Sequence, residues 1–362
     1  MTLIDKSLPY VRAISPYLPG KPITELAREM GIPVENIVKL ASNENPLGMS
    51  PKARKAVELA INGIERYPDQ FDLIKAVAER CKLAQNQVVL GNGSNDVLDL
   101  IARVFLAPGR SAIFAQHAFA VYPLATLSTG AELISTPAKN YGHDLNAMLA
   151  AIRPDTRLIW IANPNNPTGN FLPYPEVRAF LETVPKDVVV VLDEAYNEYI
   201  PPAVRADTAE WIKDFPNLVI TRTFSKIFGL AGLRVGYALA SAEIADLMNR
   251  VRQPFNVNNL AIAAAIAALD DHAFVAESYE LNRRGMEQII AGLKHLGLEH
   301  IPSHGNFITF KAGDGAAVNQ KLLKQGVIVR PIGGYGLPEW LRVTIGKEPE
   351  NTRFLEALEK AL

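Results

Sequence analysis

Residues 218–239 read Leu-Val-Ile-Thr-Arg-Thr-Phe-Ser-Lys-Ile-Phe-Gly-Leu-Ala-Gly-Leu-Arg-Val-Gly-Tyr-Ala-Leu. The segment begins with an apolar run at 218–221 and ends with another at 235–239, and each run has the length of a strand. Hydroxyl, glycine and basic side chains are concentrated between the two runs. Runs that are apolar at nearly every position indicate strands buried on both faces of a sheet. The stretch therefore predicts two buried strands joined by a polar segment.

Similar apolar runs lie upstream of this stretch. They cover 87–90, 111–114, 131–134, 158–162 and 188–192, and helical spacing is found at 96–105. Strands of this kind, separated by helices or long connections, are typical of a mostly parallel sheet.

The pattern changes after residue 260. A long helical stretch at about 273–296 is followed by short strands at 306–310, 327–330 and 340–345 and by a helix near Glu350. We therefore predict an α/β fold with three regions. These are an N-terminal arm with part of a small domain over 1–45, a large domain with a mostly parallel sheet flanked by helices over 46–260, and a smaller α+β domain over 261–362.

Composition excludes several classes of protein. The 362 residues include 37 basic and 38 acidic side chains, and 48% are hydrophobic, as in a soluble globular protein. The net charge of −1 offers no electrostatic footprint for nucleic acid. The longest apolar run, Leu260 to Leu269, is too short for a bilayer, which needs roughly 20 residues. A single cysteine, Cys81, and a start without a signal-peptide pattern lead us to expect a cytoplasmic protein that binds neither nucleic acid nor membrane.

Lys226 is the first candidate catalytic residue. Most lysines are solvated surface charges, but this one follows an apolar strand and lies among small residues. The hydroxyls of Thr223 and Ser225, together with Arg234, suit a phosphate group. An amine beside a phosphate site can form a Schiff base with an aldehyde cofactor.

A carboxylate follows the preceding strand. Asp193 comes directly after the run 188–192, at the strand edge where α/β sheets bind ligands. Pyridoxal phosphate (PLP) needs a carboxylate at its ring nitrogen, and Tyr196 could donate to the phenolic oxygen of the same ring. Asp193 could instead cap a helix, but with Lys226 after the next strand we favour the cofactor site.

Two loops also leave strand ends. The loop Asn163–Gly169 has the proline and glycine content of a turn, and Asn166 within it could donate to the phenolic oxygen. The loop Gly91–Asn95 precedes a helix, whose first N–H groups could bind an anion, although a plain turn explains it equally well. It lacks the third glycine of a dinucleotide fingerprint and the lysine of a P-loop.

Together these segments resemble the fold-type I PLP-dependent aminotransferases, the aspartate aminotransferase superfamily, from about Tyr17 to Thr344. The resemblance is carried by Ser225-Lys-x-x-Gly-Leu-Ala-Gly-Leu-Arg234, Asn163-Pro-x-Asn-Pro-Thr-Gly169 and Asp193-Glu-Ala-Tyr196, in a characteristic combination.

The resemblance implies PLP as cofactor, no metal, and a role for each matching position. Lys226 would hold the cofactor covalently and, once released, act as the general base. The phosphate would be bound by Ser94, Asn95, Thr223, Ser225 and Arg234, the ring nitrogen by Asp193, and the phenolic oxygen by Asn166 and Tyr196. Phe119 would stack on the ring, where many relatives have tyrosine. Tyr67 would reach the phosphate in the neighbouring subunit, which implies a homodimer with shared active sites.

Three further segments, Ala41–Gly48, Arg66–Asp69 and Leu341–Gly346, resemble the branch of the superfamily that transfers the amino group of L-histidinol phosphate to 2-oxoglutarate. In that branch Arg342 would grip the anionic end of the substrate, with Arg330, Asn45 and Tyr17 completing the pocket. Arginines also form surface ion pairs, but the apolar neighbours of Arg342 argue against this.

Three other functions stay open on the sequence alone. An aromatic amino-acid aminotransferase would use the same arginines, because a guanidinium suits a carboxylate as well as a phosphate. A PLP-dependent threonine-phosphate decarboxylase would share nearly every cofactor residue. A non-catalytic nucleotide-binding module is the third alternative, and it would be a colourless protein.

Overall fold

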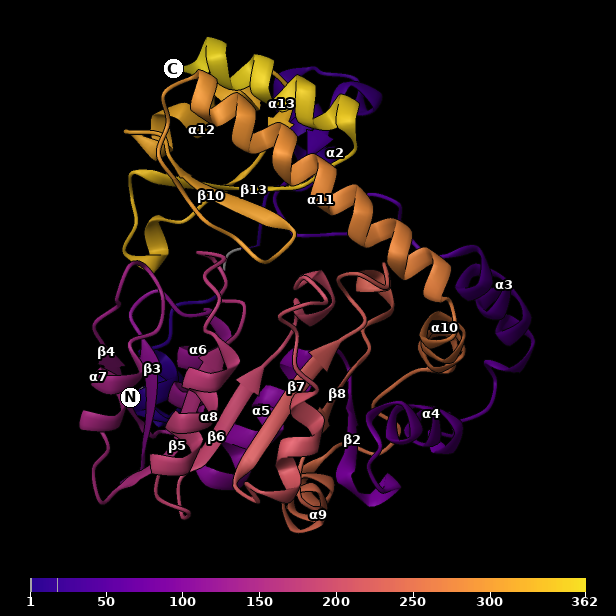
Figure 1. Ribbon diagram of the computed structural model, residues 1–362, viewed down its shortest axis with the longest axis vertical. Coiled ribbons are helices and arrows are strands. Elements are labelled where there is room, and N and C mark those ends of the chain that lie inside the picture. Colours follow the sequence, from indigo (N-terminus) through magenta and orange to yellow (C-terminus); the bar gives the residue numbers. More distant parts are fainter. Residues whose placement is uncertain (1, 18) are drawn as a thin grey trace.

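The computed structural model describes residues 2–17 and 19–362. Its larger part is built on a seven-stranded sheet with the strand order β2-β8-β7-β6-β5-β3-β4 (Figure 1). The strands are β2 (Val88–Gly91), β3 (Ser111–Ala115), β4 (Glu132–Thr136), β5 (Thr156–Ala162), β6 (Val189–Asp193), β7 (Leu218–Thr223) and β8 (Gly236–Leu239).

Five of these strands run parallel, from β4 through β3, β5 and β6 to β7. The prediction of a mostly parallel sheet is confirmed. The apolar run at 235–239 differs from the other strands, because β8 lies antiparallel to both β7 and β2.

Helices cover both faces of this sheet, as the apolar strands require. Alternate strand residues point to opposite sides: Val190 and Leu192 to one core, Val189 and Val191 to the other. The first core is covered by α4 (Phe71–Cys81), α7 (Leu145–Ala150), α8 (Tyr174–Thr183) and α10 (Asn259–Leu269). The second is covered by α5 (Ser94–Phe105), α6 (Val121–Ser128) and α9 (Ala242–Val251).

The smaller part contains a four-stranded antiparallel sheet, in the order β12-β13-β10-β9. These strands are β9 (His300–Ile301), β10 (Phe307–Lys311), β12 (Arg330–Pro331) and β13 (Trp340–Thr344). Their core lies under α11 (His272–His295), α12 (Gly315–Lys324) and α13 (Glu348–Ala361). A separate parallel pair joins β1 (Val38–Lys39) to β11 (Val327–Ile328), and α2 (Ile23–Met30) packs nearby. The segment up to about residue 45 therefore contributes to the small sheet region.

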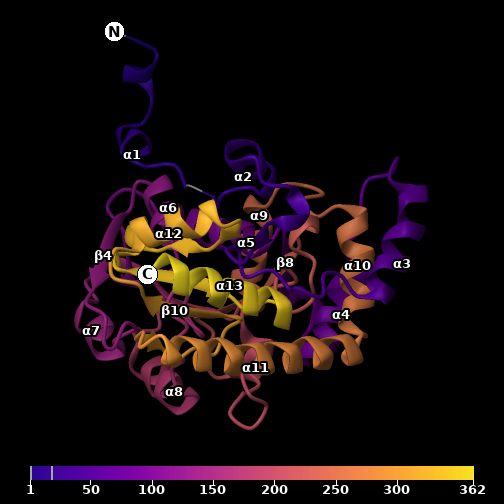
Figure 2. The same cartoon turned by 90° about the horizontal axis from the view of Figure 1, so that it is seen from above.

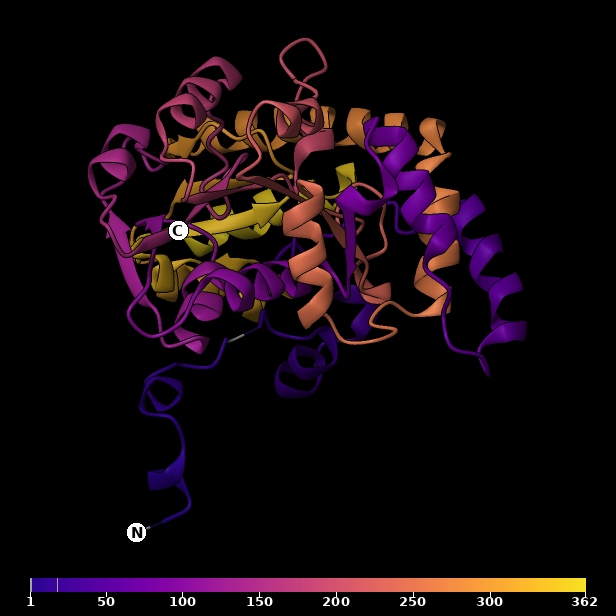
Figure 3. The same ribbon diagram turned by 90° about the horizontal axis from the view of Figure 1, so that it is seen from below.

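The first residues project from the body of the molecule (Figures 2 and 3). They include the short helix α1 (Pro9–Arg12), and the side chains of Leu3, Ile4 and Leu8 are exposed. Within the described residues no single helix is long and apolar enough to cross a membrane, although α10 and α11 taken together, with a bend of 81° between them, meet that test by length and composition.

The predicted boundary at residue 260 falls at the start of α10. This helix packs against α3 (Pro51–Ala60) and α4, and its alanines lie in the core under the large sheet. Helix α11, by contrast, runs from this region across to the small sheet and packs on α13 (Figure 1). On this packing we propose that the large domain extends through α10.

Candidate active site

A cavity of about 260 Å³ opens at the carboxyl ends of β5, β6 and β7, and the small sheet forms its opposite wall. Parallel strands that end at one edge bring their following loops together there. The cavity is lined by thirteen of the residues predicted for the site: Tyr17, Ser94, Asn95, Phe119, Asn166, Asp193, Tyr196, Thr223, Ser225, Lys226, Arg234, Arg330 and Arg342.

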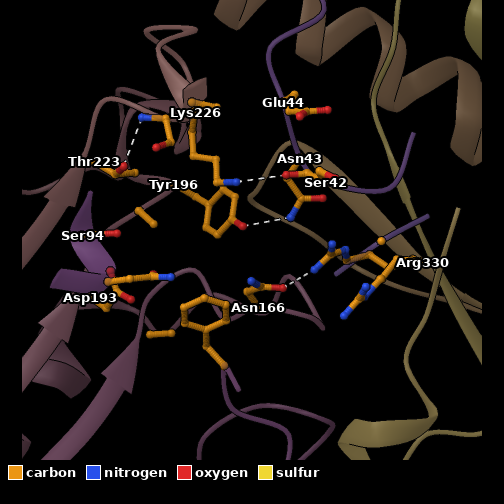
Figure 4. Close-up of a pocket in the computed structure, with 18 of the residues that line it drawn as sticks. Ser42, Asn43, Glu44, Ser94, Asn166, Asp193, Tyr196, Thr223, Lys226 and Arg330 are labelled. Carbon is orange, nitrogen blue, oxygen red and sulfur yellow. Dashed lines mark hydrogen bonds between the residues drawn. The ribbon is translucent and has the colours of Figure 1, made fainter. Parts of the chain in front are cut away.

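Lys226 projects into the cavity from the turn that follows β7 (Figure 4). Its Nζ donates a hydrogen bond to the Ser42 carbonyl at 3.1 Å and lies 5.7 Å from the centre of the Tyr196 ring. Burial, and then the positive charge of Arg342, lower the pKa of Lys226 to about 8. A neutral amine, the form needed for nucleophilic or base chemistry, is therefore accessible near neutral pH.

The turn that carries Lys226 requires glycine at position 229. The Gly229 amide closes the turn on the Lys226 carbonyl at 2.9 Å, with a φ of +69°. A Cβ at this position would overlap the Gly48 carbonyl. The close approach of these two backbone segments thus fixes the backbone position from which the Lys226 side chain projects.

Asp193 ends β6 and is held at both carboxylate oxygens. Tyr122 Oη donates to Oδ2 at 2.8 Å, and Thr221 Oγ1, directly opposite on β7, donates to Oδ1 at 2.9 Å. Tyr122 is itself stacked on Trp160, with ring centres 5.2 Å apart. Burial raises the pKa of Asp193 to about 6, and the two hydrogen bonds oppose that rise. A buried carboxylate held by neutral donors favours a cationic partner in the cavity.

A cluster of anion-binding groups lies at the start of α5. Gly93, with a φ of +84°, stands at the N-cap, so Ser94 and Asn95 present the first backbone N–H groups of the helix. The Arg234 guanidinium packs against Gly93, where a Cβ would overlap it, and donates to Ser225 Oγ at 3.3 Å. Hydroxyls, a guanidinium and a helix N-terminus in one corner suit a phosphate.

Two donors face the cavity from the loops after β5 and β6. Asn166 Oδ1 accepts a hydrogen bond from Arg342 Nη1, which leaves its NH₂ group as a donor for the cavity. Tyr196 Oη accepts from Asn43 Nδ2 at 2.9 Å (Figure 4). Phe119 lines the cavity beside them and packs edge-on against Tyr122.

Two arginines form the wall contributed by the small sheet. Arg330 on β12 and Arg342 on β13 are paired in register. Arg330 lies over the Tyr17 ring at 5.4 Å, and Arg342 lies over the Phe307 ring at 5.3 Å and donates to the Ala41 carbonyl at 2.8 Å. Among the described residues Arg342 Nε has no hydrogen-bond partner although it is buried. The side chain of Arg342 nevertheless lines the cavity together with Arg330, so two guanidinium groups are available on this wall for an anionic ligand.

Two predicted residues lie outside the cavity in the part of the chain that the structure describes. The Asn45 amide donates to the Ile227 carbonyl at 2.7 Å and to Ser278 Oγ at 2.9 Å, so it ties three segments together behind the site. The structure does not bring Asn45 to the substrate pocket, and we no longer propose it there. Tyr67 is 81% exposed and stacks on Phe255 at 4.5 Å, so its predicted role in a neighbouring subunit stays a prediction.

Sequence reasoning missed several residues that the geometry brings in. Tyr122 and Thr221 hold Asp193, and Ser42, Asn43 and Glu44 line the cavity. Tyr122 lies three residues after the predicted Phe119. Thr221 lies opposite Asp193 on the neighbouring strand, so strand register could have identified it. Asn43 has a left-handed backbone, with φ of +55°, which the sequence does not specify.

The residues present fit PLP. The phosphate corner, the buried carboxylate, the two donors and a lysine of lowered pKa match the phosphate, ring nitrogen, phenolic oxygen and aldehyde of that cofactor. Among the described residues no group of three or more histidine, cysteine or acidic side chains is arranged to hold a metal ion.

Comparison with known families agrees with this geometry. The family described as aminotransferase class I and II matches residues 35–358. The chain belongs to the class I and II aminotransferases. An aminotransferase is an enzyme, so the nucleotide-binding module considered above is set aside.

Individual relatives place this aminotransferase more closely. It is 89% identical, over the full length of both chains, to histidinol-phosphate aminotransferase 1 of Dechloromonas aromatica. It is 59% identical to histidinol-phosphate aminotransferase 2 of Nitrosospira multiformis, over 100% of this chain and 93% of that one. The chain therefore belongs to the same family as these histidinol-phosphate aminotransferases.

Solved structures share the fold. The histidinol-phosphate aminotransferase of Sinorhizobium meliloti, in complex with pyridoxal-5'-phosphate, has a TM-score of 0.90 and 27% identity, covering 98% of this chain and 97% of that one. An aspartate aminotransferase of Thermus thermophilus with maleate, at 20% identity, has a TM-score of 0.84 over 98% of each chain and shows the fold alone. The predicted fold type I architecture is confirmed.

Proposed function

We propose that this aminotransferase holds PLP through Lys226 and transfers the amino group of L-histidinol phosphate to 2-oxoglutarate, giving imidazole acetol phosphate and L-glutamate. One observation carries the proposal: a buried lysine and a buried carboxylate share a cavity that has a cationic corner at each end. The names of the relatives support the substrate.

PLP, when bound, supplies an electron sink that lets the bond at the substrate α-carbon break and stores the amino group between the two half-reactions. Asp193 would hold the ring nitrogen, and Asn166 and Tyr196 the phenolic oxygen. Arg234, Ser225, Thr223 and the start of α5 would hold the phosphate.

Lys226 would move the proton. Its amine is buried, and a pKa of about 8 means that a useful fraction is neutral at physiological pH. With PLP bound, the neutral amine of Lys226 would be placed to take the proton from the substrate α-carbon and to deliver it to the cofactor. The hydrogen bond to the Ser42 carbonyl would hold the free amine in the cavity.

Arg330 and Arg342 would bind the end of the substrate remote from the reacting carbon. Paired guanidinium groups suit the phosphate of histidinol phosphate in one half-reaction and the distal carboxylate of 2-oxoglutarate in the other. Both substrates can therefore use one pocket in turn, as alternating half-reactions on one cofactor require.

We further propose a cytoplasmic homodimer in which Tyr67 reaches the PLP phosphate of the neighbouring subunit. Its exposure and its stacking on Phe255 support this, because an exposed aromatic pair is suited to burial in an interface.

The experiment that tests the proposed substrate is a comparison of kcat/KM for histidinol phosphate, phenylalanine and tyrosine, each with 2-oxoglutarate. A clear preference for histidinol phosphate supports the proposal, whereas a preference for phenylalanine or tyrosine would establish the aromatic aminotransferase instead. Release of carbon dioxide from threonine phosphate without formation of glutamate would identify a decarboxylase.

A further inference from the structure

Asn43 lies at the centre of a hydrogen-bond network between the two parts of the molecule. The residue is 1% exposed, and its backbone is left-handed, with φ of +55°. Among non-glycine residues, asparagine and aspartate adopt this conformation most readily. Its two neighbours line the same cavity, and Ser42 accepts the hydrogen bond from Lys226 (Figure 4).

The network fixes which way the Asn43 amide points. Thr344 Oγ1 accepts from the Asn43 backbone N–H at 2.9 Å, so the threonine proton is available for the Asn43 Oδ1 at 3.1 Å. With Oδ1 acting as an acceptor, the NH₂ group faces Tyr196 and donates to its hydroxyl at 2.9 Å.

The direction of that last hydrogen bond determines what Tyr196 can do. The Tyr196 oxygen accepts a hydrogen bond from Asn43, so the Tyr196 O–H must donate to a different acceptor. Tyr196 lines the cavity, and it lies with Lys226 and Asn166 around the same space (Figure 4). Burial raises the pKa of Tyr196 to about 12, so the hydroxyl keeps this proton at physiological pH.

We propose that Asn43 is a positioning residue that keeps the Tyr196 hydroxyl as a hydrogen-bond donor toward the phenolic oxygen of PLP. The inference rests on the proposed cofactor. The proposal also connects the two parts of the molecule, because Thr344, which holds Asn43, lies on the same strand as Arg342, β13. Strand β13 therefore carries both Arg342, which would bind the substrate anion, and Thr344, which orients Asn43 and through it the Tyr196 hydroxyl.

Replacing Asn43 by aspartate tests the direction of the hydrogen bond. Asp tolerates the left-handed backbone and has nearly the same shape, but its carboxylate can only accept. The Tyr196 proton would then turn toward residue 43 and away from the cofactor. A donor to the phenolic oxygen favours its deprotonated form and lowers the pKa of the proton that this oxygen shares with the Lys226 nitrogen.

The readout is the pH midpoint at which the visible absorption band of the PLP-loaded protein changes. We expect N43D to raise this midpoint by about one pH unit, as the loss of one charge-assisted hydrogen bond would. Y196F, which lacks the hydroxyl, should raise it similarly. The matched control is N217D, because Asn217 is also buried but donates to the Val188 carbonyl at the far end of the sheet. It should leave the midpoint unchanged.

The double variant separates positioning from charge. In the Y196F background, N43D should add almost nothing to the midpoint, because no hydroxyl remains to be turned. An equal shift in both backgrounds would mean that the new charge acts directly, and it would overturn the proposal, as would an N43D protein that titrates like the parent. A parent protein that retains no visible band once unbound PLP has been removed would instead refute the proposed cofactor. Thermal unfolding of each variant shows whether the fold is retained.

Discussion

Lys226 and Asp193 are two buried ionisable side chains whose pKa values move in opposite directions. Burial disfavours the charged form of each, so the pKa of the lysine falls to about 8 and that of the aspartate rises to about 6. The two values approach neutrality from opposite sides. Such convergence in one cavity is typical of residues that exchange protons or pair with a charged ligand.

Replacing Lys226 by alanine should remove transamination while leaving the fold intact. Loss of a general base costs roughly 10²–10⁴-fold in rate, and loss of the covalent link adds to this. We expect no glutamate-dependent turnover above background in K226A, with an unfolding temperature close to that of the parent. The control is K213A, because Lys213 is exposed on the surface. Appreciable turnover by K226A, or borohydride labelling of a different lysine, would contradict the assignment.

Asp193 should make the cofactor-free protein less stable as the pH rises. Its pKa in the folded protein, about 6, exceeds its ordinary value of 3.8, so the folded state binds the proton more tightly than the unfolded one. The contribution to stability is complete below about pH 4 and is lost as the pH rises through about 6, by an amount of about 3 kcal/mol. Urea unfolding of the cofactor-free parent and of D193N across this range measures the difference.

D193N has no titrating group at this position, so its stability relative to the parent should increase between about pH 4 and about pH 6. PLP should bind D193N more weakly, because the amide cannot pair with a protonated ring nitrogen. A constant stability difference between D193N and the parent across the range would show that the Asp193 carboxyl titrates normally.

At the scale of elements, the turn between β7 and β8 positions Lys226 through one glycine. G229A should lower the free energy of unfolding by at least about 2 kcal/mol, because an alanine there combines a positive φ with overlap of the Gly48 carbonyl. It should also weaken PLP binding, since the lysine moves with the turn. The matched control is G232A in the same segment, where a Cβ would meet nothing within 4 Å among the described residues. Equal stability of the two variants would refute this account.

The elements themselves were largely predictable from the sequence. The seven apolar runs predicted as strands between residues 87 and 239 each became a strand of the large sheet, because strands buried on both faces are apolar at nearly every position. The longest apolar run, Leu260 to Leu269, lies instead in helix α10. The antiparallel direction of β8 was not visible, since an apolar run has no direction. The run at 327–330 became two short strands in different sheets, β11 and β12, which depends on pairing with distant residues.

The candidate site was predictable where a residue lies inside a motif beside a strand end, as for Asp193, Lys226 and Arg234. It was not predictable where a contact joins distant segments. Asn43 and Thr344 are 301 residues apart, and the hydrogen bonds between them follow from tertiary packing alone.

At the scale of the whole molecule, the cavity has a cationic corner on each of the two proposed domains. Arg234 and the start of α5 lie on the large one, and Arg330 and Arg342 lie on the small one. A ligand that joins the two corners therefore bridges the domains. Binding at both corners would hold the small sheet against the edge of the large sheet at which Lys226 and Asp193 lie.

The proposed dimer can be tested by mixing subunits of two different variants. If Tyr67 completes the site of the neighbouring subunit, K226A and Y67A homodimers are each defective, but a mixed dimer contains one intact site. That site takes Lys226 from one chain and Tyr67 from the other. Random exchange of subunits should restore about a quarter of the parental activity, since half of the dimers are mixed and each has one working site of two.

The measurement is glutamate formation after the two inactive proteins are unfolded together and refolded, compared with each protein refolded alone. The matched control replaces Y67A by Y10A, because Tyr10 lies on the projecting arm and outside the cavity lining. Y10A is itself expected to be active, so its mixture with K226A reports only dilution of working sites. Activity in the K226A and Y67A mixture that does not exceed that of the separate proteins would mean that each chain builds its own site, because subunit exchange could then supply nothing that either chain lacks.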